Sequence, residues 1–196
     1  MKSSVKLCLL AVAVVAASVG ARTGGAADRG AAGGQSATES SALQTSGDGR
    51  IYIKALAKAL QESDRIVVTE HSNVDDILDP ETQPQRPVKY NPTIYTSHEL
   101  TPSDRAEFLG SIKRMPATTQ VSEPACIFEP HHTISFYRGK AQTSAMRICF
   151  QCEQVKWDGT TKSRPRSLVP TLKTFLENWG MQAERDWRRL AKAGAK

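Results

Sequence analysis

Two runs of alternating apolar and polar residues flank the tripeptide Arg138-Gly139-Lys140, and this arrangement constrains the fold more than any other feature. Before the tripeptide, Ile134 and Phe136 alternate with polar neighbours, and after it Ile148 and Phe150 do the same. A period of two is typical of strands with one buried face. Because a glycine between two such runs is typical of a hairpin turn, we predict an antiparallel sheet built around this hairpin.

The other apolar runs predict helices on both sides of these strands in the sequence. Thr101 followed by Pro102 is typical of a helix start, with a capping hydroxyl and a proline in the first turn. Periodicity predicts helices over 51–62, 101–114, 167–178 and 182–192, and strands over 66–69, 93–96, 125–128, 132–137 and 145–157. The predicted fold class is α+β, a small and mostly antiparallel sheet with a C-terminal meander, packed by N- and C-terminal helices.

The first 50 residues differ in composition from the rest of the chain. Residues 1–21 combine Lys2 and Lys6 with an apolar run and end at Ala21, which is typical of a secretory signal peptide. Residues 22–50 are rich in Gly, Ala and Ser and predict a disordered linker. Residues 51–192 then form one domain, and we expect the protein to be exported, periplasmic or secreted, with no membrane span after signal cleavage.

Charge gives little indication of a partner. The formal net charge is +6, and two of the positive charges lie in the predicted signal peptide. Near the C-terminus, Glu184 and Asp186 interrupt the basic residues around Arg185, so no nucleic-acid partner is expected. Upstream, Asp75 and Asp76 belong to an acidic stretch without the spacing of a calcium loop, which we interpret as a solvated loop. The oligomeric state stays open.

Three cysteines and two histidines in the C-terminal half form the one group that could carry chemistry. Pairing about a turn at Gly139 places Cys149 opposite residues 130–132, and Cys152 opposite residues 127–129. The hairpin therefore brings cysteine and histidine side chains within reach of one another. The candidate metal ligands are Cys126, His131, His132, Cys149 and Cys152.

Several uses of this group stay open. Thiolates and an imidazole would suit a tetrahedral zinc ion, although a continuous strand would send Cys149 and Cys152 to opposite faces. An exported protein could instead hold one disulfide, from Cys126 to Cys149 or Cys152, with one thiol left over. Cys149 and Cys152 could form a redox pair, but no helix start follows to lower a thiol pKa. The cysteines could also be buried and inert, and the histidines could be ordinary polar residues.

The residues 126–136 and 148–152 resemble an uncharacterised, often exported bacterial domain. In that domain a C-x-F-x-P-x-H-x-I-x-F strand precedes an I-C-F-x-C strand, and the resemblance covers about 51–180. It implies that the cysteines and His132 act as a set, and it implies no reaction.

The expected function is therefore that of an exported domain whose cysteine and histidine cluster binds a structural or sensed metal ion, with zinc as the expected ion. One alternative is a thiol-dependent redox protein or enzyme that uses Cys149 and Cys152. The other is a disulfide-stabilised interaction module of the cell envelope. Whether the protein is an enzyme stays open at this point.

Overall fold

The structure, a computed structural model, describes residues 36–77, 90–119 and 125–194, with side chains described from residue 47 onward. The predicted signal peptide, 1–21, and residues 22–35 of the predicted linker lie outside the described residues. The elements in chain order are α1 (Ser36–Glu62), β1 (Arg65–His71), the short 3-10 helix η1 (Val74–Asp76), β2 (Ile94–Glu99), α2 (Pro102–Arg114), β3 (His132–Arg138), β4 (Ala141–Cys149), β5 (Gln154–Trp157), α3 (Leu168–Asn178) and α4 (Trp187–Gly194).

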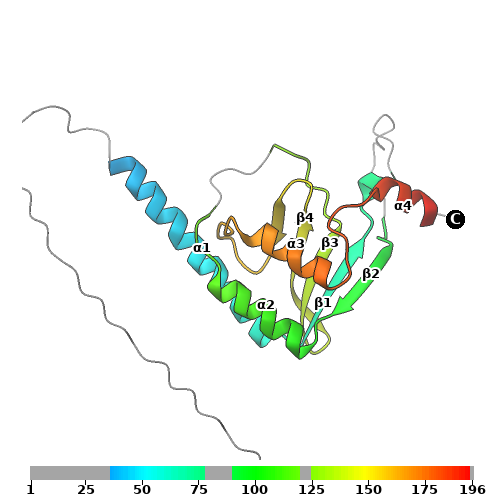
Figure 1. Cartoon of the computed structure of the whole chain (residues 1–196), viewed down its shortest axis with the longest axis horizontal. Helices are drawn as coiled ribbons and strands as arrows, with labels where there is room; N and C mark the ends of the chain where they lie inside the picture. The colour runs from blue at the N-terminus through cyan, green and yellow to red at the C-terminus, as the bar shows by residue number, and fades with distance from the viewer. Residues whose placement is uncertain (1–35, 78–89, 120–124, 195–196) are drawn as a thin grey trace, which may run out of the picture. The chain divides into compact units, whose positions relative to one another are not determined.

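The strands form one sheet in the order β2-β1-β3-β4-β5, and every neighbouring pair is antiparallel (Figure 1). The predicted α+β class is confirmed. Gly139 turns the β3–β4 hairpin with a φ of +58°, a conformation that glycine adopts without the steric cost other residues meet. His132 faces Ile148 and Ile134 faces Met146 in this hairpin, which is the predicted register.

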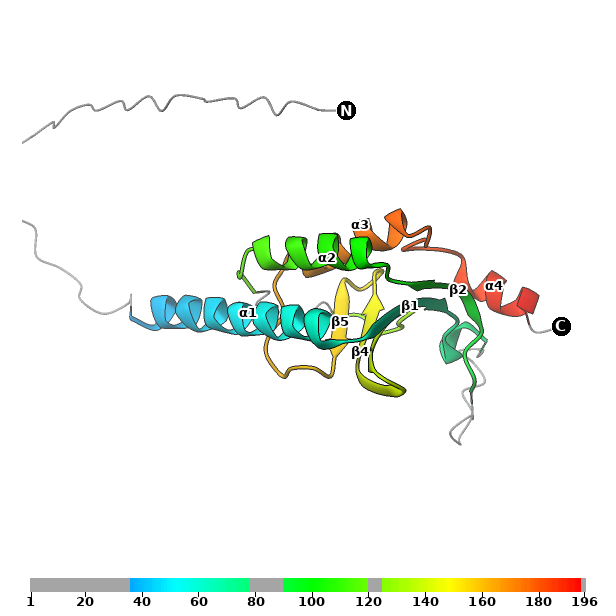
Figure 2. The same cartoon turned by 90° about the horizontal axis from the view of Figure 1, so that it is seen from below.

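One face of the sheet is covered by helices. Alternate residues of the central strands are fully buried, and they belong to the same apolar core as residues from α1, α2 and α3. These strand residues are Ile66, Val68, Ile134, Phe136, Met146 and Ile148. The residues between them, such as Thr133 and Arg147, face the other way, so this second face is the open face of the sheet. Helix α4 lies at the opposite end of the domain from the start of α1 (Figure 2).

Helix α2 begins where the sequence predicts. The Thr101 hydroxyl accepts a hydrogen bond from the Asp104 backbone N–H at 3.1 Å, and the Asp104 carboxylate accepts one from the Thr101 backbone N–H at 2.9 Å. This reciprocal capping box satisfies donors that the first helical turn would otherwise leave unpaired. The helix ends at Arg114, just before Met115 and Pro116.

Helix α1 begins at Ser36 rather than at Ile51, so the predicted linker is helical over 36–50. Few of these residues are large and apolar, which is why burial periodicity gave no signal there. Ser, Thr, Gly and Asp make up most of the segment and have low helix propensity, but the segment continues a helix that the core anchors, so no new nucleus is needed. Among the residues that the structure describes, no helix has both the length and the apolar character needed to cross a membrane.

The single strand predicted over 145–157 is wrong. The chain turns over residues 150–153, where the Glu153 N–H donates to the Phe150 carbonyl oxygen at 3.0 Å, and β4 and β5 are separate strands. Glu153 has a φ of +48°, which is uncommon for a residue other than glycine. The buried Arg164 guanidinium donates a hydrogen bond to the Glu153 carbonyl oxygen and supports this turn.

Further boundaries differ from the prediction, since β1 ends at His71 rather than at 69, β2 ends at Glu99 rather than at 96, and β4 begins at Ala141 rather than at 145. Residues 125–128 form no strand, because Cys126 is held at the β4–β5 turn by a disulfide and Pro130 has no N–H to donate to a ladder. The last helix begins at Trp187 rather than at Gln182, and the Asp186 carboxylate accepts a hydrogen bond from the Arg189 N–H at its start.

We predict that Thr101→Ala lowers the free energy of unfolding by about 1 kcal/mol, because it removes the capping hydroxyl of α2. Ser103→Ala, an exposed serine in the same helical turn, serves as the matched control and should change stability little. Urea unfolding of both variants measures the difference, and an equal loss in the two would contradict the capping role.

Candidate functional site

The hairpin brings the predicted cysteine and histidine residues to one end of the sheet. Since His132 faces Ile148, the next position places Cys149 beside His131, as predicted. Cys152 lies in the turn after β4, close to the chain segment that carries Cys126. The predicted register is therefore confirmed as far as Cys149. Cys152 reaches this end of the sheet through the turn after β4 and its disulfide to Cys126, not through strand pairing.

Cys126 and Cys152 form a disulfide, with their Cα atoms 5.8 Å apart. Cys149 is a free thiol, and only 2% of its surface is exposed. Of the alternatives that the sequence left open, the described geometry matches one disulfide with one thiol left over. It gives Cys152 a partner other than Cys149, because the turn after β4 carries Cys152 toward Cys126.

The two histidines make different contacts. The Nε2 of His131 lies 3.0 Å from a carboxylate oxygen of Asp76, and both side chains are buried. The His131 ring also stacks on Trp187 of α4 with a centroid separation of 4.3 Å. His132 is fully buried, and its ring packs edge-on against Phe150 and Trp187. His131 thus connects the buried Asp76 carboxylate to α4, and His132 packs inside the core at this end of the sheet.

A zinc ion held by Cys126, His131, His132, Cys149 and Cys152 stays a prediction. The disulfide uses two of the three thiols, and His131 has a carboxylate partner. In the ranges 36–77, 90–119 and 125–194, no group of three or more His, Cys, Asp or Glu side chains is arranged to hold a metal ion. The interactions present at this end of the sheet are the Cys126–Cys152 disulfide and the contact between His131 and Asp76.

Burial controls the protonation of His132. Desolvation, together with the nearby His71, His131 and Arg185, lowers the pKa of His132 to about 3, although the backbone of Gln182 favours the charged form. His132 is therefore neutral across the physiological range. It acts as a packing residue there and carries no positive charge into the core.

A buried carboxylate nearby fixes the segment before α4. Glu70 is fully buried at the end of β1, and its carboxylate lies 2.8 Å from the Nε of Arg185. The Gln182 backbone N–H donates to the same carboxylate at 3.3 Å. These contacts hold the chain between α3 and α4 against the sheet. Sequence analysis missed Glu70, and its only signal was an acid directly after the β-branched run of β1.

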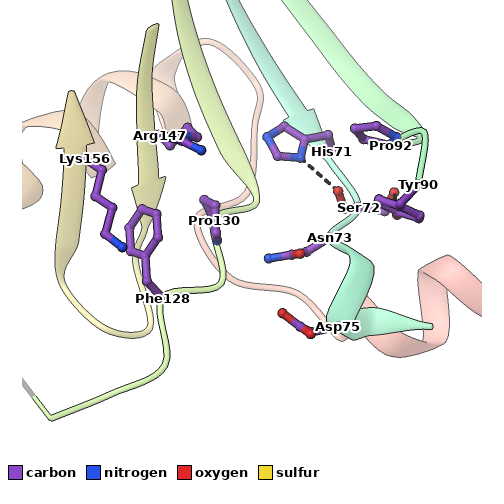
Figure 3. A pocket seen from close by; sticks show the side chains of 10 residues that line it. All are labelled: His71, Ser72, Asn73, Asp75, Tyr90, Pro92, Phe128, Pro130, Arg147 and Lys156. Atoms are coloured by element: carbon purple, nitrogen blue, oxygen red, sulfur yellow. Dashed lines mark hydrogen bonds between the residues drawn. The ribbon is translucent and has the colours of Figure 1, made fainter. Parts of the chain in front are cut away.

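A pocket opens at the same end of the sheet, on the open face, with a volume of about 340 Å³ (Figure 3). One wall carries Arg147 from β4 and Lys156 from β5, which face each other across the two strands. The Lys156 ammonium group lies 4.3 Å from the centre of the Phe128 ring, which also lines the pocket. Both cations are exposed, and in the described part of the chain neither forms an ion pair.

The other wall is the loop after β1, where Asn73 and Asp75 point into the pocket (Figure 3). Asp76 anchors this loop, because its carboxylate accepts a hydrogen bond from the Asn73 N–H at 2.6 Å and also contacts His131. The acidic stretch that we interpreted as a solvated loop is thus divided by the fold. Asp76 is buried and structural, whereas Asp75 stays at the pocket.

His71 lies between the two walls, and Tyr90 completes the lining on the side of Ser72 (Figure 3). The His71 Nδ1 lies 2.9 Å from the Ser72 carbonyl oxygen, which can only accept, so Nδ1 carries the proton and Nε2 accepts from the Thr133 hydroxyl. Burial lowers the pKa of His71 and outweighs its hydrogen bond to Ser72. The Tyr90 hydroxyl donates to the Ser72 hydroxyl, which also accepts from the Thr93 N–H at 2.7 Å. With His71 neutral, the formal charges of the pocket come from Arg147, Lys156 and Asp75.

Comparison with protein families, with curated proteins and with solved structures finds no match for this chain. The function must therefore be inferred from the site itself.

We predict that Cys126→Ser lowers the free energy of unfolding by about 3 kcal/mol, because the disulfide closes a loop of moderate length in the unfolded chain. Cys149→Ala is the matched control and should cost about 1 kcal/mol, since it removes one buried sulfur atom. Urea unfolding of the non-reduced proteins measures both. A smaller loss for Cys126→Ser than for Cys149→Ala would contradict the structural role of the disulfide.

We predict that His132 makes the protein less stable in acid. Its pKa is about 3 in the folded chain and about 6.5 in the unfolded chain. The contribution of neutral His132 to the free energy of unfolding is therefore fully present above pH 6.5 and is lost as the pH falls toward 3. Within this range the free energy of unfolding changes by about 1.4 kcal/mol per pH unit because of this residue. Denaturant unfolding between pH 7 and pH 3.5 should show a shallower slope in His132→Phe than in the wild type, and parallel profiles would contradict the assignment.

Proposed function

We propose that this protein is an exported, disulfide-stabilised binding module that holds a small organic anion in the pocket lined by Arg147 and Lys156. The observation that carries the proposal is the pairing of these two cations on one wall of a cavity without a carboxylate partner in the described chain. Most basic side chains around a folded domain are scattered in solvent, whereas two cations that converge on a concave site attract an anion.

The chemistry of the wall supports an organic anion. An arginine guanidinium offers a planar set of donors that matches a carboxylate, and a lysine ammonium adds a compact charge. Phe128 adds aromatic surface beside Lys156, and Tyr90 adds aromatic surface on the opposite side of the pocket (Figure 3). A pocket of about 340 Å³ lies toward the small end of ligand sites. We therefore infer a ligand with one anionic group on a short, partly apolar body.

The disulfide supports one wall of the proposed binding pocket. It holds Cys126 next to the β4–β5 turn, and the Cys152 sulfur lies 3.0 Å from the Ile127 carbonyl oxygen. The next residue, Phe128, then covers Lys156. Both cysteines therefore support one wall of the pocket, which favours a structural bridge over a thiol pair that cycles in a reaction.

Export is part of the same proposal. Residues 1–21 have the composition of a secretory signal peptide, and a disulfide between Cys126 and Cys152 is typical of a compartment that oxidises thiols. A periplasmic or secreted binding module would meet small ligands outside the cytoplasm. The proposal assigns no reaction to the site.

We predict that 4-ethylbenzoate, used as a simple organic anion, binds the purified protein in this pocket. Arg147→Gln and Lys156→Gln should each weaken binding about tenfold, because each removes a charge-assisted contact to the carboxylate. Lys140→Gln makes the same charge change at the exposed hairpin turn and should leave the affinity unchanged. Heteronuclear NMR titration measures the dissociation constants, and equal affinity in all four proteins would contradict the proposal.

A further inference from the structure

We propose that the ligand of this pocket is a zwitterion, whose anionic end meets Arg147 and Lys156 and whose ammonium end meets Asp75. This inference rests on the proposed function and adds the chemical class of the ligand to it. It depends on a second feature of the pocket, the acidic wall opposite the two cations (Figure 3).

Asp75 and the two cations line the same cavity, yet no ion pair joins them. Opposite charges on flexible exposed side chains pair readily when their backbones allow it. Here Arg147 and Lys156 lie on strands β4 and β5, whereas Asp75 lies in η1 after β1. The two walls therefore hold the charges on separate sides of the pocket, and a ligand that places opposite charges at its two ends complements both.

The acidic wall is fixed in place before any ligand binds. Buried Asp76 contacts the Asn73 N–H on one side and His131 on the other. The His131 ring is in turn stacked on Trp187. Asp75 therefore projects from a turn that Asp76 closes through Asn73 and connects to the core through His131, and such preorganisation reduces the entropy lost on binding.

The middle of the pocket suits a short apolar body. Phe128 and Pro130 lie between Lys156 and the acidic wall, and Pro92 lines the far side of the pocket beside Tyr90 (Figure 3). Asn73 adds an amide beside Asp75, with an oxygen that can accept from an ammonium group. The lining has two cations and one carboxylate, so a ligand with an anion at one end and an ammonium at the other gives every charged group of the pocket a partner.

The experiment compares two ligands that share size and shape. The probe 4-(aminomethyl)benzoate carries a carboxylate and an ammonium group, and 4-ethylbenzoate has a methyl group in place of the ammonium. We expect the wild-type protein at low ionic strength to bind 4-(aminomethyl)benzoate about fivefold more tightly, which is typical of one partly exposed ion pair. In Asp75→Asn this preference should vanish, while the affinity for 4-ethylbenzoate stays the same or rises.

The two proposals fail in different ways in this titration. If both probes bind in an Arg147-dependent manner with equal affinity, or if Asp75→Asn keeps the fivefold preference, the zwitterion inference is overturned and the anion site stands. If neither probe binds, or if Arg147→Gln changes neither affinity, both proposals are overturned. Glu129→Gln, a half-buried acid outside the pocket lining, is the matched control and should preserve the preference.

Discussion

The register of the β3–β4 hairpin is the constraint on which the rest of the domain depends. Pairing Ile134 with Met146 sends the large apolar side chains of both strands to the helix-covered face. The same pairing sends Thr133 and Arg147 to the open face. A shift of one residue would exchange the two faces, expose the core and bury a guanidinium group. One backbone alignment therefore specifies both the apolar core and the cationic wall of the pocket.

Two buried polar contacts connect the sheet to segments outside it, one to the turn beside the pocket and one to the segment before α4. Asp76 connects η1 to His131 at the start of β3, and Glu70 connects β1 to Arg185 in the segment before α4. A buried carboxylate is costly unless it is paired or hydrogen-bonded, and each of these two has a cationic or histidine partner and a backbone N–H donor. The Asp76 contacts position the turn that carries Asp75, and the Glu70 contacts fix the segment before α4. Trp187 of α4 stacks on His131.

The sequence was most informative where a local signal had one physical meaning. Alternation about Gly139 predicted the hairpin and its register, and Thr101 with Pro102 predicted the start of α2.

The sequence was least informative where a distant contact decides the local conformation. Glu153 adopts a positive φ in a turn that Arg164 supports from another part of the chain, so a continuous apolar run concealed the break between β4 and β5. Because that break sets which residue of β5 faces Arg147, the proximity of Arg147 and Lys156 could not be predicted. The cysteine and histidine cluster was predicted as a neighbourhood, but Asp76 as the partner of His131 lies far away in sequence and carried no motif.

The buried position of Cys149 has a consequence for how this chain matures. Cys126, Cys149 and Cys152 could pair in three different single disulfides, and Cys149 is the nearest of the other two in sequence to Cys152. Only the finished sheet withdraws the Cys149 sulfur from solvent while it leaves Cys126 beside Cys152. Strand pairing before oxidation therefore favours the Cys126–Cys152 bridge, because it buries the one thiol that would compete for either partner. The sheet thus acts as a selector among the possible disulfides of this end of the domain.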